Sequence, residues 1–217
     1  MAVAPKVSER QTEVPEPTPG SLHEARKLAS GCRRCDLYRN ATQTVFGEGA
    51  VPSALMLVGE QPGDQEDRQG RPFVGPAGRV LDRALADAGI PRDAAYVTNA
   101  VKHFKNVPRG KRRIHQKPNL AEMRVCKWWL DLELALVAPR VVVALGATAA
   151  RALLGRAVTI GKERGQAVAL RDGLTGFVTV HPSFILRQGS DAARDGAYRG
   201  LVADLALVAE RLGRGAP

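Results

Sequence analysis

Four short apolar runs, separated by segments of helical periodicity, constrain the fold of this chain more than any other feature. They occupy residues 54–58, 96–101, 141–145 and 177–180. A short continuous apolar run predicts a strand buried on both faces, as in parallel sheets. A parallel crossover needs a dozen or more residues, which the helical segments supply. The pattern therefore predicts an α/β fold, a three-layer α/β/α sandwich with a central four-stranded parallel sheet.

Capping residues and helical spacing define the expected helices. Ser21 with Glu24, and Asn119 with Glu122, have the spacing of a capping box. We predict a helix that leads from Ser21 toward residue 32, and further helices over 76–88, 120–137 and 191–212. At 217 residues with 44% hydrophobic side chains, the chain suits one domain. We assign it to residues 21–217, after a disordered leader over residues 1–20 that carries several prolines among charges.

Charge and hydropathy narrow the classes of partner. The formal net charge of +10 favours a polyanion such as nucleic acid, although a basic surface also serves solubility alone. No run approaches the roughly 18 apolar residues of a membrane span, and the first 20 residues lack the apolar core of a secretory signal. We expect a cytoplasmic protein without a membrane partner. Nothing in the sequence indicates a coiled coil, and we expect a monomer.

Polar residues follow each apolar run, where the carboxyl ends of parallel strands form ligand sites. They are Gly59 to Asp64 after the first run, Lys102 and His103 after the second, Gly146 to Thr148 after the third, and His181 to Ser183 after the fourth. Each stretch alone is compatible with an ordinary loop, but four together predict one site. The first loop lacks the Gly-Lys-Ser/Thr of a P-loop, which disfavours a nucleoside triphosphatase.

Several of these motifs resemble the family 4 uracil-DNA glycosylases. They are Gly-Glu-Gln-Pro-Gly-Asp at 59–64, Arg-Pro-Phe-Val-Gly-Pro-Ala-Gly at 71–78, Tyr-Val-Thr-Asn at 96–99 and His-Pro-Ser at 181–183. The resemblance spans about residues 21–212. It implies excision of uracil from DNA, both single-stranded and duplex, in DNA repair. Such enzymes flip the base out of the strand into a pocket.

The resemblance also implies roles for individual residues. Phe73 is expected to stack on the extruded uracil, Asn99 to read its Watson–Crick edge, and His181 to stabilise the uracil anion at O2. Glu60 or Asp64 is expected to stabilise the cationic sugar. We expect the rest of the substrate-binding surface to come from Gly59, Gln61, Gly63 and Ser183.

The segment 105–117 is too basic to be a core element, and taken alone it predicts a solvated loop that grips phosphates through Lys111, Arg112 and Arg113. Its string Lys-Arg-Arg-Ile-His, placed after the strand of Asn99, resembles the UdgX branch of the superfamily. Members of that branch become covalently joined to the abasic DNA through this histidine, here His115. A neutral imidazole is a competent nucleophile, and we expect Glu60 to fix its tautomer.

Cysteine spacing predicts a metal site. Cys32 and Cys35 form a Cys-x-x-Cys pair, and Cys126 lies within the predicted helix 120–137. Family 4 enzymes usually offer four cysteines to a 4Fe-4S cluster, and His103 occupies the place of one of them. We therefore expect a 4Fe-4S cluster held by these four residues. Cys₃His also suits structural zinc, and spacing does not choose between the two.

Two alternative functions predict different behaviour toward DNA. An ordinary glycosylase would turn over, with His115 merely contacting phosphate. A non-catalytic iron–sulfur or zinc protein would bind uracil and thymine DNA alike. Either Leu186 or Arg187 is a candidate to wedge into the space left by the flipped base. We expect a turn between strands at residues 161–165.

Overall fold

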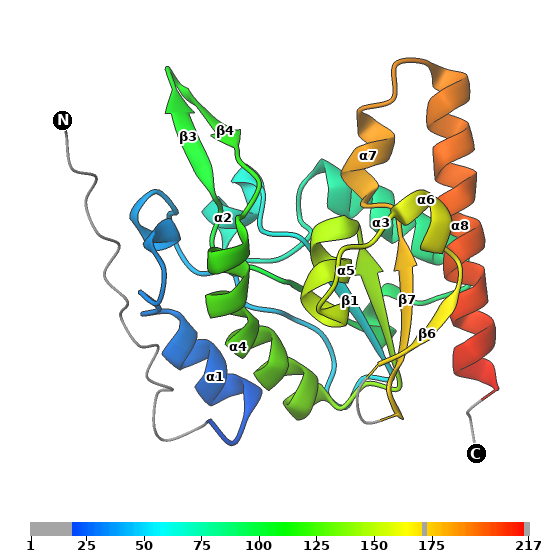
Figure 1. Ribbon diagram of the computed structural model, residues 1–217, viewed down its shortest axis with the longest axis horizontal. Coiled ribbons are helices and arrows are strands. Elements are labelled where there is room, and N and C mark those ends of the chain that lie inside the picture. Colours follow the sequence, from blue (N-terminus) through cyan, green and yellow to red (C-terminus); the bar gives the residue numbers. More distant parts are fainter. Residues whose placement is uncertain (1–18, 171–172, 215–217) are drawn as a thin grey trace.

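The computed structural model of this chain describes residues 19–170 and 173–214. The predicted leader therefore lies outside the described residues, except for its last two. A five-stranded sheet with the order β2-β1-β5-β7-β6 forms the centre (Figure 1). Its parallel strands are β1 (Leu55–Gly59), β2 (Ala95–Asn99), β5 (Val141–Leu145) and β7 (Thr175–Thr179).

All four predicted strands are confirmed, within a few residues at their ends. The fifth strand, β6 (Ala167–Ala169), pairs antiparallel with β7 and was not predicted. It is an edge strand of only three residues, so it is too short to carry much sequence signal. The prediction of a four-stranded sheet is therefore wrong by one short strand, whereas its parallel part is right.

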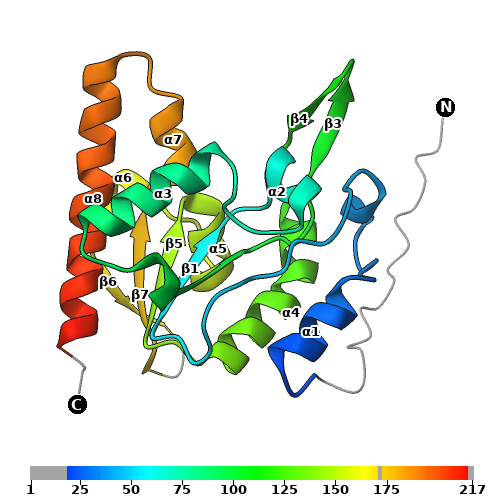
Figure 2. The same cartoon turned by 180° about the vertical axis from the view of Figure 1, so that it is seen from behind.

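Helices cover both faces of the sheet, which confirms the three-layer sandwich. One layer contains α1 (Leu22–Ala29), α4 (Leu120–Val137) and α5 (Ala147–Leu154), and the other contains α3 (Pro76–Asp87) and α8 (Asp191–Gly213) (Figures 1 and 2). The chain also forms α2 (Asp64–Gln69), α6 (Ile160–Glu163), α7 (Pro182–Leu186) and two 3₁₀ turns, η1 (Asp36–Arg39) and η2 (Arg92–Ala94).

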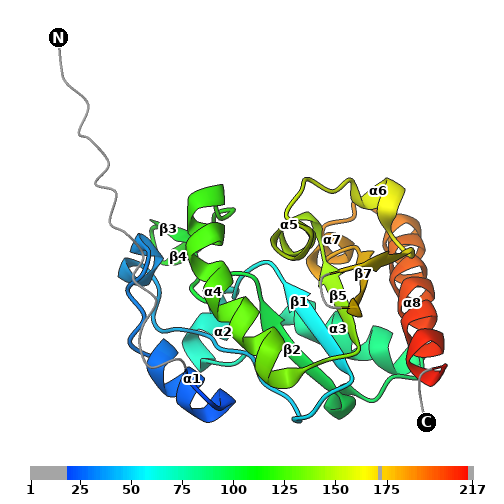
Figure 3. The ribbon, with the colours of Figure 1, turned by 60° about the horizontal axis from the view of Figure 1, so that its bottom comes forward.

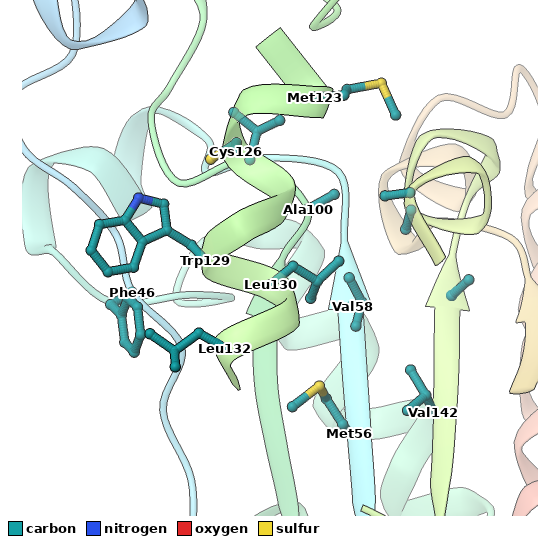
Figure 4. Close-up of a cluster of buried hydrophobic side chains, with 14 of the residues drawn as sticks. Phe46, Met56, Val58, Ala100, Met123, Cys126, Trp129, Leu130, Leu132 and Val142 are labelled. Atoms are coloured by element: carbon teal, nitrogen blue, oxygen red, sulfur yellow. The ribbon is translucent and has the colours of Figure 1, made fainter. Parts of the chain in front are cut away.

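Alternate residues of each strand enter two separate cores. In β1, Met56 and Val58 pack with α4, whereas Leu55 and Leu57 pack with α3 and α8. Figure 4 shows the first core, where Val58 of β1 lies beside Leu130 of α4 and Met56 lies further down the same strand. The strands β1, β2 and β5 are buried at every position, as the apolar runs predicted, whereas the edge strand β6 is largely exposed.

Local signals explain where the helices begin. The Asn119 side chain accepts the Glu122 N–H while the Glu122 carboxylate accepts the Asn119 N–H, so the predicted capping box is present. At α1, Ser21 accepts the Glu24 N–H, but the Glu24 carboxylate accepts from Gly20 and not from Ser21. That capping box is only half formed. Among the described residues, no helix is long and apolar enough to span a membrane.

The basic segment 105–117 is a β-hairpin and not a loop. Its strands β3 (Asn106–Arg109) and β4 (Arg112–His115) pair antiparallel, and Gly110, with a φ of +60°, makes the tight turn between them. The hairpin projects from the body on the side where the parallel strands end, across from α7 (Figures 1 and 3). Residues 161–165, predicted as a turn, begin within α6 and end in a turn at Gly165, whose φ is +72°.

Candidate active site

The candidate site is a cavity of about 1050 Å³ at the carboxyl ends of the four parallel strands. The predicted site residues that line it are Glu60, Gln61, Gly63, Phe73, Asn99, His115, His181, Ser183 and Arg187. Those that do not line it are Gly59, Asp64, Lys111, Arg112 and Arg113. Segments far apart in the sequence therefore converge on one cavity, as their position after the strands predicts.

Phe73 is held in a strained conformation on the cavity wall. Its φ is +56°, which non-glycine residues rarely adopt. A Cβ on Gly78 would lie 1.7 Å from the Phe73 carbonyl oxygen, and a Cβ on Gly59 would lie 2.7 Å from its Cζ. The Phe73 ring stacks beside that of His181, with centroids 6.1 Å apart and 29° between the planes. Two glycines thus make room for an aromatic platform in the cavity.

The Asn99 side chain offers an amide that is free to bind a ligand. Asn99 is buried, yet within the part of the chain that the structure describes its amide forms no hydrogen bond. A Cβ on Gly59 would lie 2.4 Å from its Oδ1, so that glycine is needed here too. An amide with both donor and acceptor groups facing a cavity can recognise a polar ring edge.

A fully buried ion pair supports Asn99 from below. The Lys102 Nζ lies 2.5 Å from the Glu133 Oε2, and it donates to the Asn99 carbonyl at 2.7 Å. Thr98 and Tyr96 also donate to the Glu133 carboxylate, at 2.8 and 3.1 Å. This network fixes the end of β2. The sequence did not reveal it, because the two charges lie 31 residues apart.

His181 is neutral and its tautomer is defined. Burial lowers the pKa of His181 to about 4. Its Nδ1 accepts the Ser183 N–H at 3.1 Å and lies 2.8 Å from the Ser183 Oγ, to which Arg187 Nη1 also donates. A nitrogen that accepts a backbone N–H carries no proton, so the proton is on Nε2. His181 therefore serves as an uncharged hydrogen-bond donor.

Glu60 and His115 form the polar pair of the cavity. The His115 Nε2 lies 3.3 Å from the Glu60 Oε1, and the Thr148 hydroxyl donates to the Glu60 Oε2. Burial acts to raise the pKa of Glu60, but the hydrogen bonds from His115 and Thr148 outweigh it and hold that pKa below its usual value. Glu60 is therefore a carboxylate. The His115 side chain is 51% exposed, which leaves it reachable from outside.

The hairpin that carries His115 is fastened at its middle by Arg113. The Arg113 guanidinium bonds to Asp64 Oδ1 at 2.6 Å and to Asp67 Oδ2 at 2.5 Å, and it stacks over the Phe104 ring. Burial acts to raise the pKa of Asp64, but the bonds from Arg68 and Arg113 outweigh it and hold that pKa low. Arg113 thus meets protein carboxylates where phosphates were predicted, and Asp64 holds the hairpin instead of facing the cavity.

The base of the hairpin is fastened by Gln61. Its Nε2 donates to the carbonyls of Gln116 and Lys105, at 3.0 and 3.3 Å, and its Oε1 accepts the Lys105 N–H at 3.1 Å. The predicted substrate-binding amide is therefore committed to both ends of the hairpin, although the residue still lines the cavity.

Glu66 and Thr148 line the cavity but were not predicted as site residues. Glu66 accepts the Gly75 N–H at 2.7 Å and the Gly63 N–H at 3.1 Å, so it ties the loop of Glu60 to that of Phe73. Its position three residues after Gly63 has capping-box spacing, which was an available signal. Thr148 lies in a predicted polar stretch, but its bond to Glu60 spans 88 residues and depends on the fold.

The predicted cysteine ligands lie near one another. Cys126 is buried, and burial raises its pKa to about 12, with smaller contributions from Cys35 and Cys32. Two N–H groups point at the sulfurs: the Lys102 backbone N–H lies 3.2 Å from the Cys126 Sγ, and the Trp129 Nε1 lies 3.3 Å from the Cys32 Sγ. Such N–H···S bonds accompany thiolate ligands of iron–sulfur clusters.

The fourth predicted ligand is turned elsewhere. The His103 Nε2 lies 2.9 Å from the Thr44 hydroxyl, and burial lowers the pKa of His103. Over residues 19–170 and 173–214, no three His, Cys, Asp or Glu side chains are arranged to hold a metal ion. The donors nevertheless match a cluster in kind. Arg34, between Cys32 and Cys35, has a buried Nε and Nη1 without a hydrogen-bond partner in the described residues, which an anionic group would satisfy.

Comparison with known proteins shows the family to which this chain is similar. The family model described as "Uracil DNA glycosylase superfamily" matches residues 46–206. A Type-4 uracil-DNA glycosylase of Thermotoga maritima is 38% identical over 164 residues, which cover 75% of this chain and 82% of the relative. One of Pyrobaculum aerophilum is 34% identical over 176 residues, 77% and 85% of the two chains. A Type-5 uracil-DNA glycosylase of Thermus thermophilus is 36% identical over 125 residues, 51% and 53% of the two chains.

Proposed function

Because the chain belongs to the uracil-DNA glycosylase superfamily, we propose that it excises uracil from DNA in repair and that His115 then captures the sugar. Excision breaks the bond between C1′ of the deoxyribose and N1 of uracil. Phe73 supplies the stacking face for the extruded base, and the Asn99 amide supplies its hydrogen-bonding edge. Neither group needs to move to accept a ligand, since both already face the cavity.

Stabilisation of the leaving base falls to His181. When the C1′–N1 bond breaks, its electron pair leaves with uracil, and negative charge develops on the ring oxygens. A neutral imidazole with its proton on Nε2 donates to such an oxygen, and its low pKa keeps it from being a permanent cation. The Ser183 N–H holds the imidazole in that tautomer.

Capture of the sugar falls to His115. The Glu60 carboxylate accepts from the protonated Nε2, and the lone pair of the ring nitrogen that carries no proton forms the new bond to C1′ on the face that uracil leaves open. The imidazolium formed in this way then passes its Nε2 proton to Glu60, so the attached ring is neutral. The single observation that carries this proposal is the 3.3 Å contact between the His115 Nε2 and the Glu60 Oε1 on the cavity wall. A nucleophile held beside the sugar cation reacts before water does because its effective concentration is very high. The product is a stable adduct, so each chain reacts once, as expected of the UdgX branch.

A His115→Ser variant provides the direct test. We predict that wild-type protein and uracil-containing single-stranded DNA give a shifted band on a denaturing gel, and that the variant gives none but still releases uracil. His23→Ser is the matched control, because His23 is an exposed histidine of α1 that does not line the cavity. An undiminished adduct with His115→Ser would refute the nucleophile, and uracil released in excess over wild-type protein would favour a turning-over glycosylase.

We also propose that Cys32, Cys35, Cys126 and His103 hold a 4Fe-4S cluster that organises the DNA-facing segments. Its support is the thiol donor set, the two N–H···S contacts and the two buried Arg34 nitrogens that lack a hydrogen-bond partner in the described residues. Protein purified without oxygen should contain about four iron and four sulfide per chain and absorb visible light. Cys126→Ser should lower the iron content, while the exposed-site variant Ser30→Ala should retain it. Stoichiometric zinc in colourless protein would overturn this assignment.

A further inference from the structure

The β3–β4 hairpin has two chemically different faces, which its strand register defines. The pairs Asn106–His115 and Pro108–Arg113 share one face, and Val107–Ile114 and Arg109–Arg112 share the other, because paired residues of antiparallel strands point to the same side. We call the first set the inner face and the second set the outer face.

The inner face is bound to the body of the protein. The Asn106 Nδ2 donates to the Asn40 carbonyl at 3.0 Å, Arg113 bonds to Asp64 and Asp67, and His115 contacts Glu60. The side chains that fasten the hairpin and enter the cavity therefore all belong to one face.

The side chains of the outer face form no hydrogen bond or ion pair with other described residues. Val107 and Ile114 are 46% and 38% exposed and lie directly opposite each other. Arg109 and Arg112 are exposed, and neither forms a hydrogen bond or an ion pair within the described residues. An apolar pair next to two unpaired cations, on a hairpin that projects from the body, is a surface without its partner.

We propose that the outer face binds the single-stranded DNA that flanks the target uracil. This inference rests on the proposed function, because the strand that delivers the uracil sugar to His115 must pass the hairpin that carries it. The two arginines match the charge of the backbone phosphates. The excess of ten positive charges on the chain fits the same polyanion.

The apolar pair selects a single strand over a duplex. In a duplex the bases are stacked inside and only phosphates and sugars face outward, so Val107 and Ile114 would gain little from contact. A single strand exposes the flat faces of its bases, which apolar side chains can cover while cations hold the phosphates. The combination of the two side-chain types on one face thus fits unpaired DNA.

The first measurement is the affinity of the Val107→Ser/Ile114→Ser variant for fluorescent 20-nucleotide DNA that contains thymine and no uracil. Thymine DNA keeps the experiment independent of excision. We expect a loss of about 10-fold for single strands, in line with the contribution of a few covered bases, and an unchanged affinity for the duplex. The matched control is Leu28→Ser/Leu207→Ser, which removes two equally exposed apolar side chains from α1 and α8.

The second measurement is the salt dependence of binding by Arg109→Ser/Arg112→Ser. Each phosphate contact to a single strand contributes about 0.7 to the slope of log affinity against log salt, so the slope should fall by about 1.4. The control Arg211→Ser/Arg214→Ser removes the same charge at the C-terminal end of α8, away from the hairpin (Figure 1). It should leave the slope unchanged.

The outcomes separate this inference from the proposed function. Outer-face variants that bind single strands like the wild type would overturn the inference, even if the protein forms adducts with uracil DNA. Equal losses for single strands and duplex with Val107→Ser/Ile114→Ser would also overturn it, because the apolar pair would then not select unpaired bases. Loss of single-strand affinity in these variants, with no release of uracil by the wild type, would uphold the outer face and refute the proposed function.

Discussion

At the residue scale, the environment of each ionisable side chain in the cavity sets its chemical role. Glu60 is held as a carboxylate by two hydrogen bonds, and His181 is held neutral by burial. These two groups face opposite charges in the proposed reaction, the sugar cation and the uracil anion. A neutral donor interacts more strongly with uracil as negative charge develops on the base. A charged His181 would be less selective for that stage of the reaction.

The low pKa of His181 predicts a specific dependence of stability on pH. In the unfolded chain a histidine has a pKa near about 6.5, against about 4 when folded. Between these values the unfolded chain binds more protons, so the free energy of unfolding falls as the pH falls from about 6.5 to about 4. Urea unfolding should show a smaller fall over this window for His181→Asn than for the wild type. The exposed His23→Asn should behave as the wild type, and equal pH profiles for all three proteins would refute the assignment.

Sequence reasoning located Phe73, Asn99 and His181 because each follows a strand or belongs to a recognisable motif. The contacts that Gln61, Asp64 and Arg113 make within the protein were not predicted, because these partners lie more than 40 residues away. In such cases residue type alone leaves open whether an amide or a charge meets a ligand or the protein itself. Exposure, which only the fold defines, decides between the two.

At the element scale, the β3–β4 hairpin contributes His115 to the wall of the cavity. Its alternating faces let one strand both fasten itself through Arg113 and present His115. A basic, interrupted segment has no apolar alternation, so the sequence predicted a loop. The strand is held because Asp64 and Asp67 of α2 bond to Arg113 and Glu60 contacts His115, which are contacts between distant segments that local sequence patterns do not contain.

Removal of the Arg113 anchor should uncouple capture from excision. In Arg113→Ser the hairpin loses its bonds to Asp64 and Asp67, and a displacement of about 1 Å at His115 can slow its reaction about 100-fold. We therefore predict slow adduct formation with retained uracil release, together with faster amide hydrogen exchange over residues 106–115. Arg112→Ser serves as the control, with normal adduct formation at saturating DNA. A normal rate of adduct formation in Arg113→Ser would contradict the anchoring role.

At the scale of the whole molecule, the buried pair Lys102–Glu133 connects the cavity, the cysteines and the core. Lys102 supports Asn99 through its ammonium and reaches Cys126 through its backbone N–H. Glu133 receives bonds from β2 and from the Gly47 N–H. The three-layer fold was predictable from periodicity, but this polar centre was not, because it consists of single contacts between distant elements.

Loss of one partner of this pair should be costly. In Lys102→Met the carboxylate of Glu133 stays buried without its counter-ion, and we predict a loss of about 3–5 kcal/mol in the free energy of unfolding. Lys127→Met removes the partly exposed partner of Asp131 on the same helix and should cost less than about 1 kcal/mol. Urea denaturation measures both. Similar losses for the two variants would mean that burial does not set the strength of the pair.

The most direct test of self-capture is to identify the residue that carries the sugar. After reaction with uracil DNA and digestion with nuclease and trypsin, mass spectrometry should find the deoxyribose remnant on the peptide that begins at Ile114, attached to His115. Lys117 lies on the same peptide and also lines the cavity, so fragmentation of the peptide must separate the two. Attachment to Lys117, or an unmodified peptide despite complete uracil release, would contradict the account.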